Sequence, residues 1–137
     1  MMKIKTTSIS VTTLKRCDMV DITAQIADVV AESEIIEGDC IIFCQHTTGG
    51  ITINENADPD VVHDMLMTLE ELFPKNRPGY RHYEGNSDSH IKSTLTGCSE
   101  QILIANGKMI LGTWQGVYFC EYDGPRSRTV QIQIRGI

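Results

Sequence analysis

The spacing of apolar residues along the first part of the chain changes from the period of a strand to that of a helix and back. Residues 2–14 are rich in β-branched side chains and predict a strand. Apolar residues then recur at helical spacing over residues 22–30, which predicts a helix with Asp21 as its N-cap. The apolar run at 40–44 and the alternating residues at 51–53, which follow a break at Gly49-Gly50, predict two strands that form a hairpin.

A second helix follows, and it has clear signals at both ends. Asp58 is suited to the N-cap, and Pro59 is suited to the first helical position because no amide donor is needed there. Residues 61–73 place apolar side chains at helical spacing until Pro74 ends the pattern. This amphipathic helix is expected to pack on a sheet.

The second half of the chain predicts a surface loop, a hairpin and a final strand. Residues 75–89 are polar and rich in turn-forming residues, and a short helix is expected to begin near His90. The Asn-Gly pair at 106–107 predicts a type I′ turn between two strands within residues 101–121. Residues 128–137 alternate apolar and polar side chains, which predicts a strand with one buried face.

These elements indicate an α+β protein that is mostly strand with two or three helices. No repeat, low-complexity tract or linker rich in Pro, Gly and Ser divides the 137 residues, and this length is typical of one domain. We therefore expect a single domain over residues 1–137.

Composition narrows the range of functions. Hydrophobic residues make up 41% of the chain, and no apolar stretch approaches the roughly 20 residues of a membrane span. The net charge of −6 argues against nucleic acid as a partner, because such binding depends on Lys and Arg that neutralise phosphates. The amino terminus lacks the apolar core of a secretory signal. The 5 cysteines are an odd number without CxxC spacing, and most are expected to be buried thiols. We expect a soluble, cytoplasmic protein that acts on a small ligand.

Three of the 4 histidines stand in polar, turn-rich segments and are candidate metal ligands. His46 follows the strand at 40–44, and His82 and His90 bracket a loop. Three imidazoles that converge leave an open coordination position, which catalytic zinc uses for a water or a substrate. The alternative is that these side chains are scattered over the surface. His63, on the polar side of the second helix, is expected to be solvated.

Candidate acid/base and anion-binding groups accompany these histidines. Glu55 belongs to an acidic cluster that could also hold Mg²⁺, and Glu84 lies in the loop between two of the histidines. Arg126 and Arg128 lie near glycines, and a guanidinium group matches the geometry of a phosphate or a carboxylate. The alternative for the two arginines is an ordinary hairpin with exposed side chains.

Three stretches of the chain resemble, nearly residue for residue, the YjbQ-like family of small proteins. They are HTTGGITINENADPDV at 46–61, HYEGNSDSHIKSTLTG at 82–97 and NGKMILGTWQGVYFCEYDGPRSRTV at 106–130. The resemblance implies a two-layer α+β domain in which a mixed, mainly antiparallel β-sheet packs with two or three helices. It also implies a homotrimer with sites near the subunit boundaries.

The resemblance further implies a metal site and an activity. The metal-site histidines of the family correspond to His46, His82 and His90, and imidazole ligands favour zinc over Mg²⁺. The family is similar to secondary thiamine-phosphate synthases, which join a pyrimidine methyl diphosphate to a thiazole phosphate and release pyrophosphate. Glu55 and Glu84 are the expected catalytic carboxylates. The residues expected to bind the anionic substrate are Thr47, Thr48, Asn86, Arg126 and Arg128.

Other functions are also consistent with these residues. Departure of pyrophosphate usually relies on Mg²⁺ held by oxygen ligands, so thiamine-phosphate synthesis could be a side activity. A metal-assisted hydrolase of a small metabolite would use a water activated in the open coordination position. A trimer that binds a small ligand or a metal without turnover is the non-enzymatic alternative.

Overall fold

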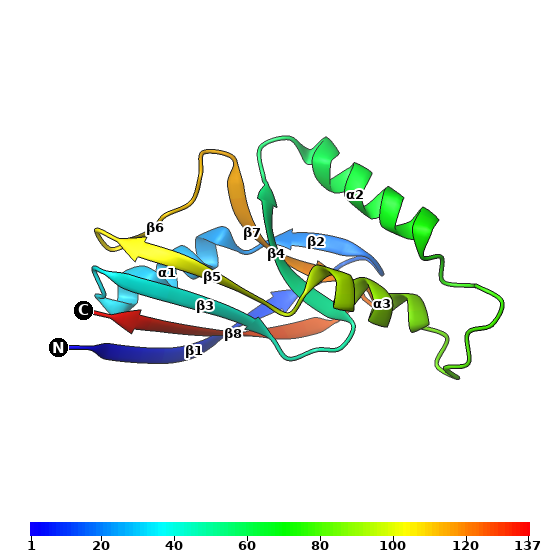
Figure 1. Cartoon of the computed structure of the whole chain (residues 1–137), viewed down its shortest axis with the longest axis horizontal. Helices are drawn as coiled ribbons and strands as arrows, with labels where there is room; N and C mark the ends of the chain where they lie inside the picture. Colours follow the sequence, from blue (N-terminus) through cyan, green and yellow to red (C-terminus); the bar gives the residue numbers. More distant parts are fainter.

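The β-branched amino-terminal segment forms β1 (Lys3–Thr12), which pairs antiparallel along its whole length with the last strand, β8 (Ser127–Gly136). The computed structural model describes all residues from 1 to 137. The other strands are β2 (Asp18–Asp21), β3 (Gly38–Cys44), β4 (Gly49–Glu55), β5 (Ser99–Ala105), β6 (Lys108–Met109) and β7 (Gln115–Glu121). They form a five-stranded sheet in the order β1-β8-β3-β5-β6 and a three-stranded sheet in the order β2-β7-β4 (Figure 1).

Three helices accompany the two sheets: α1 (Thr23–Ser33), α2 (Pro59–Leu72) and α3 (Ser87–Thr96). Every strand pair in both sheets is antiparallel. The predicted α+β class, with a mainly antiparallel sheet and two or three helices, is therefore confirmed. No helix is long and apolar enough to cross a membrane.

The hairpin predicted between β3 and β4 is wrong, because the two strands belong to different sheets. β3 pairs with β5 and β8, whereas β4 pairs with β7. Both strands present core residues, such as Ile42 and Ile51, which are fully buried. Short apolar runs of this kind mark a buried strand but do not specify which neighbour it pairs with.

The turn at Asn106 and Gly107 is confirmed, but the hairpin that it closes is short. Both residues have positive φ angles, 53° and 73°, as a type I′ turn requires. β6 ends after two residues, and the chain then leaves the five-stranded sheet to form β7 in the other sheet.

The main core fills the space between the two sheets and α1. Its members come from both sheets and from α1, and include Ile42 and Ile132 of the large sheet, Val117 and Phe119 of the small sheet and Ile26 of α1. All five are fully buried. α1 packs against β6, β7 and β8, and α3 packs against β4. This core fixes the two sheets relative to each other.

The helix ends follow the predicted signals with small shifts. The Asp58 carboxylate accepts the backbone N–H of Asp60 at 2.9 Å, and Pro59 is the first residue of α2. Asp21 stands one residue before the N-cap of α1, although it still accepts the N–H of Thr23 at 2.9 Å.

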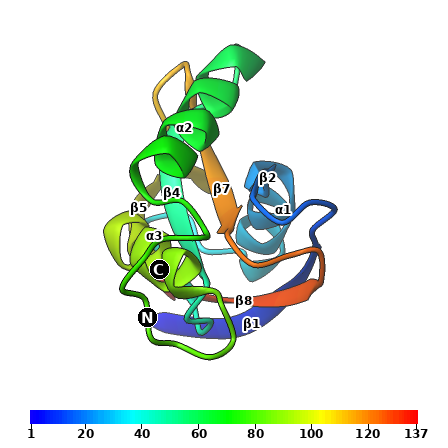
Figure 2. The same ribbon diagram turned by 90° about the vertical axis from the view of Figure 1, so that its right-hand side faces the viewer.

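α2 lies on the outside of the three-stranded sheet (Figure 2). Met65 and Leu69 are among the side chains through which it packs on a small cluster around Tyr118 and Tyr122. None of the residues of α2 is buried. The helix therefore covers the small sheet only loosely.

Candidate functional site

A polar cavity of about 500 Å³ brings together all of the predicted site residues except Glu55. No hydrophobic residue lines it. The predicted residues that line it are His46, Thr47, Thr48, His82, Glu84, Asn86, His90, Arg126 and Arg128. Gln45 and Asp123, which were not singled out from the sequence, complete its walls.

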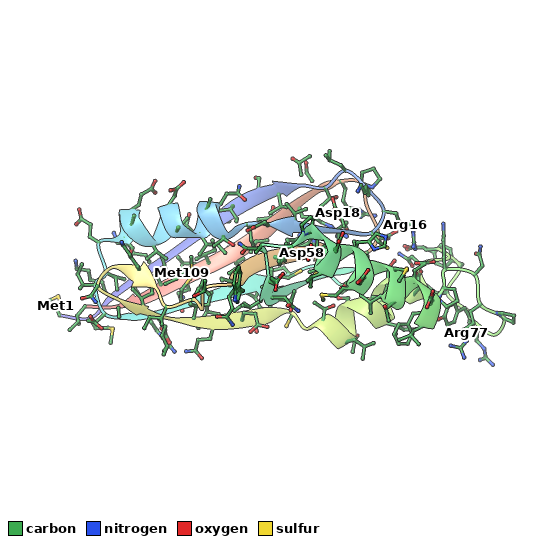
Figure 3. All side chains as sticks on the ribbon, turned by 90° about the horizontal axis from the view of Figure 1, so that it is seen from above. Met1, Arg16, Asp18, Asp58, Arg77 and Met109 are labelled. Atoms are coloured by element: carbon green, nitrogen blue, oxygen red, sulfur yellow. The ribbon has the colours of Figure 1, made fainter.

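Three connecting segments build this cavity, together with His90 of α3 and Arg128 of β8. Residues 45–48 link β3 to β4, residues 122–126 link β7 to β8, and residues 73–86 lead from α2 into α3. The first two segments both cross between the sheets, and the Tyr122 backbone N–H donates to the Thr48 carbonyl at 3.1 Å, which ties them together. The third segment contains Arg77 and lies at the end of the molecule opposite Met1 (Figure 3).

The three histidines share the cavity but are held in different ways. His82 and His90 are neighbours, with ring centroids 5.4 Å apart and ring planes at 80°. The His46 Nε2 atom lies 3.1 Å from both the N–H and the carbonyl oxygen of Thr129. The His46 ring also meets the ring of Phe119 edge-on, with centroids 6.3 Å apart. His46 is thus fixed by the backbone of β8 and by the core.

The ligand types in this cavity fit a transition metal, but the present spacing does not form a finished site. Imidazole nitrogen is a common zinc ligand, and the Nδ1 atom of His46 is available for a metal in the tautomer whose Nε2–H donates to the Thr129 carbonyl. In the other tautomer Nε2 accepts the Thr129 N–H, and Nδ1 carries the proton. However, no three His, Cys, Asp or Glu side chains are grouped closely enough to hold a metal ion together. A site with all three histidines would require their side chains to move closer.

The Glu84 carboxylate accompanies His82. The Glu84 Oε2 atom lies 3.9 Å from the His82 Nε2 atom, and both side chains are exposed. This distance is too long for a hydrogen bond but allows an ion pair when the imidazole is protonated. Glu84 is therefore placed to orient His82 or to exchange protons in the cavity.

Arg128 lies in the wall of the cavity, and most of its donors are already engaged. Its side chain is 3% exposed and forms an ion pair with Glu121, which is fully buried. The Arg128 guanidinium group also donates to the Thr48 hydroxyl at 2.9 Å. Burial opposes ionisation of Glu121, but hydrogen bonds from Arg128, the Asp123 N–H and Thr13 outweigh it and lower the pKa of this carboxyl. Arg128 thus supports the wall of the cavity.

Arg126 is the more available arginine. Its side chain is 50% exposed and contacts Asp123 through an ion pair of 3.3 Å and a 2.9 Å hydrogen bond from Nε to the Asp123 carbonyl. The guanidinium group has five N–H donors, so several stay free for an anion. Arg126 is the cationic side chain of the cavity that is best placed to meet a ligand.

Glu55 is not part of this cavity. It ends β4, and its carboxylate accepts the backbone N–H of Asp58 at 3.2 Å, in the turn that leads into α2. This bond gives Glu55 a structural role at the start of α2.

A buried ionic cluster at α3 was not predicted from the sequence. Asp88 is fully buried and accepts hydrogen bonds from Arg16 and from Lys92, whose side chain is 1% exposed. Lys92 also pairs with Glu70 of α2 at 2.8 Å. Burial opposes the charge of Asp88, but the bonds from Arg16 and Lys92 outweigh it and lower the pKa of the carboxyl. The cluster anchors α3, which begins directly after Asn86 and contains His90, and both of these residues line the cavity.

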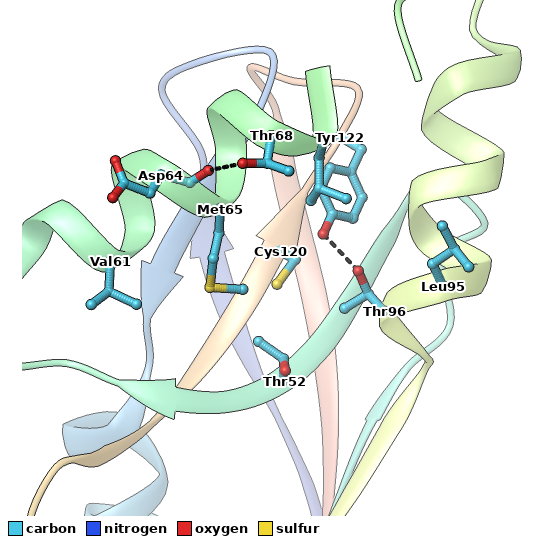
Figure 4. A pocket seen from close by; sticks show the side chains of 10 residues that line it. Thr52, Val61, Asp64, Met65, Thr68, Leu95, Thr96, Cys120 and Tyr122 are labelled. Carbon is cyan, nitrogen blue, oxygen red and sulfur yellow. Dashed lines mark hydrogen bonds between the residues drawn. The ribbon is translucent and has the colours of Figure 1, made fainter. Parts of the chain in front are cut away.

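A second, mainly apolar cavity of about 620 Å³ lies between α2 and the small sheet (Figure 4). Met65, Leu69 and Leu95 line it, and the Tyr122 hydroxyl bonds to Thr96 at 2.6 Å at its edge. None of the predicted site residues lines this cavity. The polar cavity is therefore the candidate site.

The fold and the residues of this site agree with a family assignment. A family model described as UPF0047 protein YjbQ-like matches residues 7–137. The chain belongs to this YjbQ-like family, and the resemblance expected from its motifs is confirmed.

Relatives from bacteria and archaea cover nearly the whole chain. The UPF0047 protein YugU of Bacillus subtilis is 49% identical over 129 residues, which span 94% of this chain and 98% of that protein. The UPF0047 protein MJ1081 of Methanocaldococcus jannaschii is 53% identical over 124 residues, which span 90% of this chain and 89% of that protein. The names of both relatives identify a family and no reaction.

Solved structures of the family have the same fold. A YjbQ/UPF0047-family protein of Clostridium acetobutylicum is 52% identical, covers 93% of this chain and 98% of its own, and has a TM-score of 0.91. A YbjQ-like protein of Sulfolobus solfataricus is 32% identical, covers 100% of both chains and has a TM-score of 0.95.

Proposed function

We propose that the polar cavity is the active site of a metal-dependent enzyme that acts on a small phosphorylated metabolite. The observation that carries the proposal is the meeting of three histidines, two carboxylates and one available arginine in a cavity without hydrophobic residues. Imidazoles and a carboxylate suit metal binding and proton transfer, and the arginine suits a phosphate.

His46, His82 and His90 are the proposed ligands of a divalent metal, with zinc preferred over Mg²⁺ because of the nitrogen donors. When bound, such a cation would stabilise negative charge on a departing phosphate group. Closer approach of the histidines is expected on binding, because no three such side chains are grouped in the structure. The His46 ring is held by Thr129, so the adjustment is expected in the exposed segment that carries His82.

The proposed reaction is the one suggested by the family resemblance. The methylene carbon of a pyrimidine methyl diphosphate forms a bond to the ring nitrogen of a thiazole phosphate, and its bond to oxygen breaks with release of pyrophosphate. Arg126 would donate to phosphate oxygens, with Thr47, Thr48 and Asn86 as further polar contacts in the same cavity. Glu84 takes the acid/base role, because it is the predicted catalytic carboxylate that lines the cavity.

The proposal is tested by incubating the purified protein with both substrates and zinc, manganese or magnesium, and by separating thiamine phosphate chromatographically. We expect His46→Ala and His82→Ala each to lower the rate by about 100-fold or more, as removal of a metal ligand or general acid/base does. Arg126→Ala is expected to lower it about 10- to 100-fold through the loss of charged hydrogen bonds.

His63→Ala is the matched control. This histidine is 70% exposed, bonds only to its neighbour Asp64 and does not line the cavity. It should keep full activity and metal content. Absence of product above background with every metal would reject the synthase reaction. Metal content that is the same in wild type and in a His46, His82, His90 triple alanine variant would reject the metal site.

We also propose that the protein is a cytoplasmic homotrimer. Several large apolar side chains are at least 60% exposed in the isolated chain, among them Leu72, Leu103 and Trp114, and they support contacts between subunits. Sedimentation equilibrium is expected to give three times the mass of one chain, and the mass of a single chain across the concentration range would reject the trimer.

A further inference from the structure

The Asn86 side chain has an unused hydrogen-bond acceptor in the wall of the polar cavity. Asn86 is 7% exposed, and its Oδ1 atom is buried without a partner. Buried polar atoms nearly always have a partner, since an unpaired one keeps the full cost of leaving water. Asn86 lines the polar cavity, but its Oδ1 atom has almost no accessible surface of its own. A ligand in the cavity would meet this oxygen only after the side chains that cover it move aside, and the oxygen is a candidate contact for such a ligand.

The direction of the Asn86 amide is fixed by Asp123. The Nδ2 atom donates to the Asp123 Oδ2 atom at 2.8 Å. An ionised carboxylate can only accept hydrogen bonds, so the amide must turn its NH₂ group toward Asp123 and its oxygen away. Asn86 is also the N-cap of α3, a position where an Asn oxygen commonly accepts a helix N–H, but it makes no such bond here.

Asp123 also holds the available arginine. The Arg126 NH2 atom lies 3.3 Å from the same Asp123 Oδ2 atom that accepts from Asn86, and the Arg126 Nε donates to the Asp123 carbonyl. The Asp123 N–H in turn donates to Glu121 at 3.0 Å, which ties the residue to the buried ion pair with Arg128. The Asp123 carboxylate therefore holds the Arg126 guanidinium group and the Asn86 amide next to each other.

We propose that the cavity selects ligands that carry an anionic group and, a few bonds away, a hydroxyl or amino donor. Arg126 contacts the anionic group, the Asn86 oxygen accepts the donor, and Asp123 is the positioning residue that holds both. The inference rests on the proposed role of the cavity as an anion site and specifies which anions it prefers.

Two probes that differ by one hydroxyl group test the selectivity. Isothermal titration calorimetry compares 2-hydroxyethyl phosphate with ethyl phosphate on the wild-type protein at one fixed metal content. We expect the hydroxyl compound to bind about 10-fold more tightly, because it alone supplies a donor to the buried oxygen. The comparison needs no variant, so it holds even if a substitution at Asn86 prevents folding.

Three variants assign the selectivity to these residues. Asn86→Leu keeps the size of the side chain without its acceptor and should bring the affinity ratio of the two probes close to one. Asp123→Asn should lower the same ratio, because an amide at 123 no longer forces the orientation of Asn86. Asn56→Leu is the control, since Asn56 makes the same kind of bond, to Asp21 at 3.1 Å, at an exposed position outside the cavity.

The outcomes separate this inference from the proposed function. Equal affinity of the two phosphates for the wild-type protein, or a ratio that survives in Asn86→Leu, would overturn the selectivity and leave the anion site standing. If neither phosphate binds, the anion site itself fails and the inference fails with it.

Discussion

Replacing Asp88 with Asn is expected to destabilise the protein severely, although the change removes only a charge. Asp88 is fully buried, and its two oxygen atoms accept from Arg16 at 3.0 and 2.9 Å and from Lys92 at 2.9 Å. The Lys92 ammonium is almost as buried, and its other partner is Glu70, whose side chain is 53% exposed. Without the carboxylate, the ammonium group stays buried with one partially solvated counter-ion.

The size of the effect follows from this burial. Breaking a buried ion pair by removing one partner costs about 3–5 kcal/mol, because the remaining charge is left uncompensated. Arg16 adds less, since its side chain is 28% exposed and can be solvated. A loss of about 3–5 kcal/mol is a large part of a typical unfolding free energy of about 5–15 kcal/mol.

Urea unfolding followed by circular dichroism measures this loss at one fixed protein concentration. With a slope of about 2 kcal/mol per M, the midpoint should fall by about 2 M without a change in slope. Asp64→Asn is the control, since this side chain is 70% exposed and should change the stability by no more than about 0.5 kcal/mol.

A double variant separates the buried charge from other effects. Asp88→Asn combined with Lys92→Met should be less unstable than the sum of the two single variants, because the second change removes the unpaired ammonium group. The reasoning would be refuted by a loss below about 1 kcal/mol in Asp88→Asn, or by simple additivity in the double variant.

Three further predictions concern acid, thiols and a close backbone contact. The pKa values of Asp88 and Glu121 are lowered from 3.8 and 4.5. The stability that these carboxylates provide is therefore present above about pH 4.5 and is lost as the pH falls through their native pKa values. Urea midpoints that stay constant from pH 6 to pH 3 would contradict this. Burial raises the pKa of Cys40 to about 12. A thiol reagent at pH 8 should therefore label exposed Cys98 and leave Cys40 unmodified until the protein unfolds. Mass spectrometry of the peptides measures the labelling of each cysteine. Gly50→Ala would place a methyl group 2.6 Å from the carbonyl oxygen of Gly97, which follows α3. A loss of about 1–3 kcal/mol in unfolding free energy is expected, and thermal unfolding measures it. An unchanged melting temperature would show that the strand shifts without cost.

Local signals in the sequence predicted the elements of the fold better than their pairing. Asp58 and Pro59 define the start of α2, and the turn at 106–107 has the backbone that its Asn-Gly pair predicts. The predicted hairpin of β3 with β4 failed, because strand partners are chosen by packing between distant segments. β2 was not predicted, because its four residues, 18–21, are too few for a periodic pattern.

The candidate site was predicted mainly by residue type and context. Polar histidines and arginines beside turns gave the members of the cavity, since loops at the ends of strands can meet in space. Glu55 was included because it lies in an acidic cluster, whereas the structure shows it bonded in the turn before α2. Asp123 and the pairing of Asp88 with Arg16 were missed, since such contacts join residues far apart in the sequence and leave no local pattern.

The two connections that cross between the sheets have a further consequence for the behaviour of an occupied site. Residues 45–48 and 122–126 each begin in one sheet and end in the other, and both line the polar cavity. A molecule that binds to both segments would therefore link the two sheets to each other. Its binding should therefore slow hydrogen exchange at amides of β7 and β8 alike, because the sheets must separate there before those amides open to solvent.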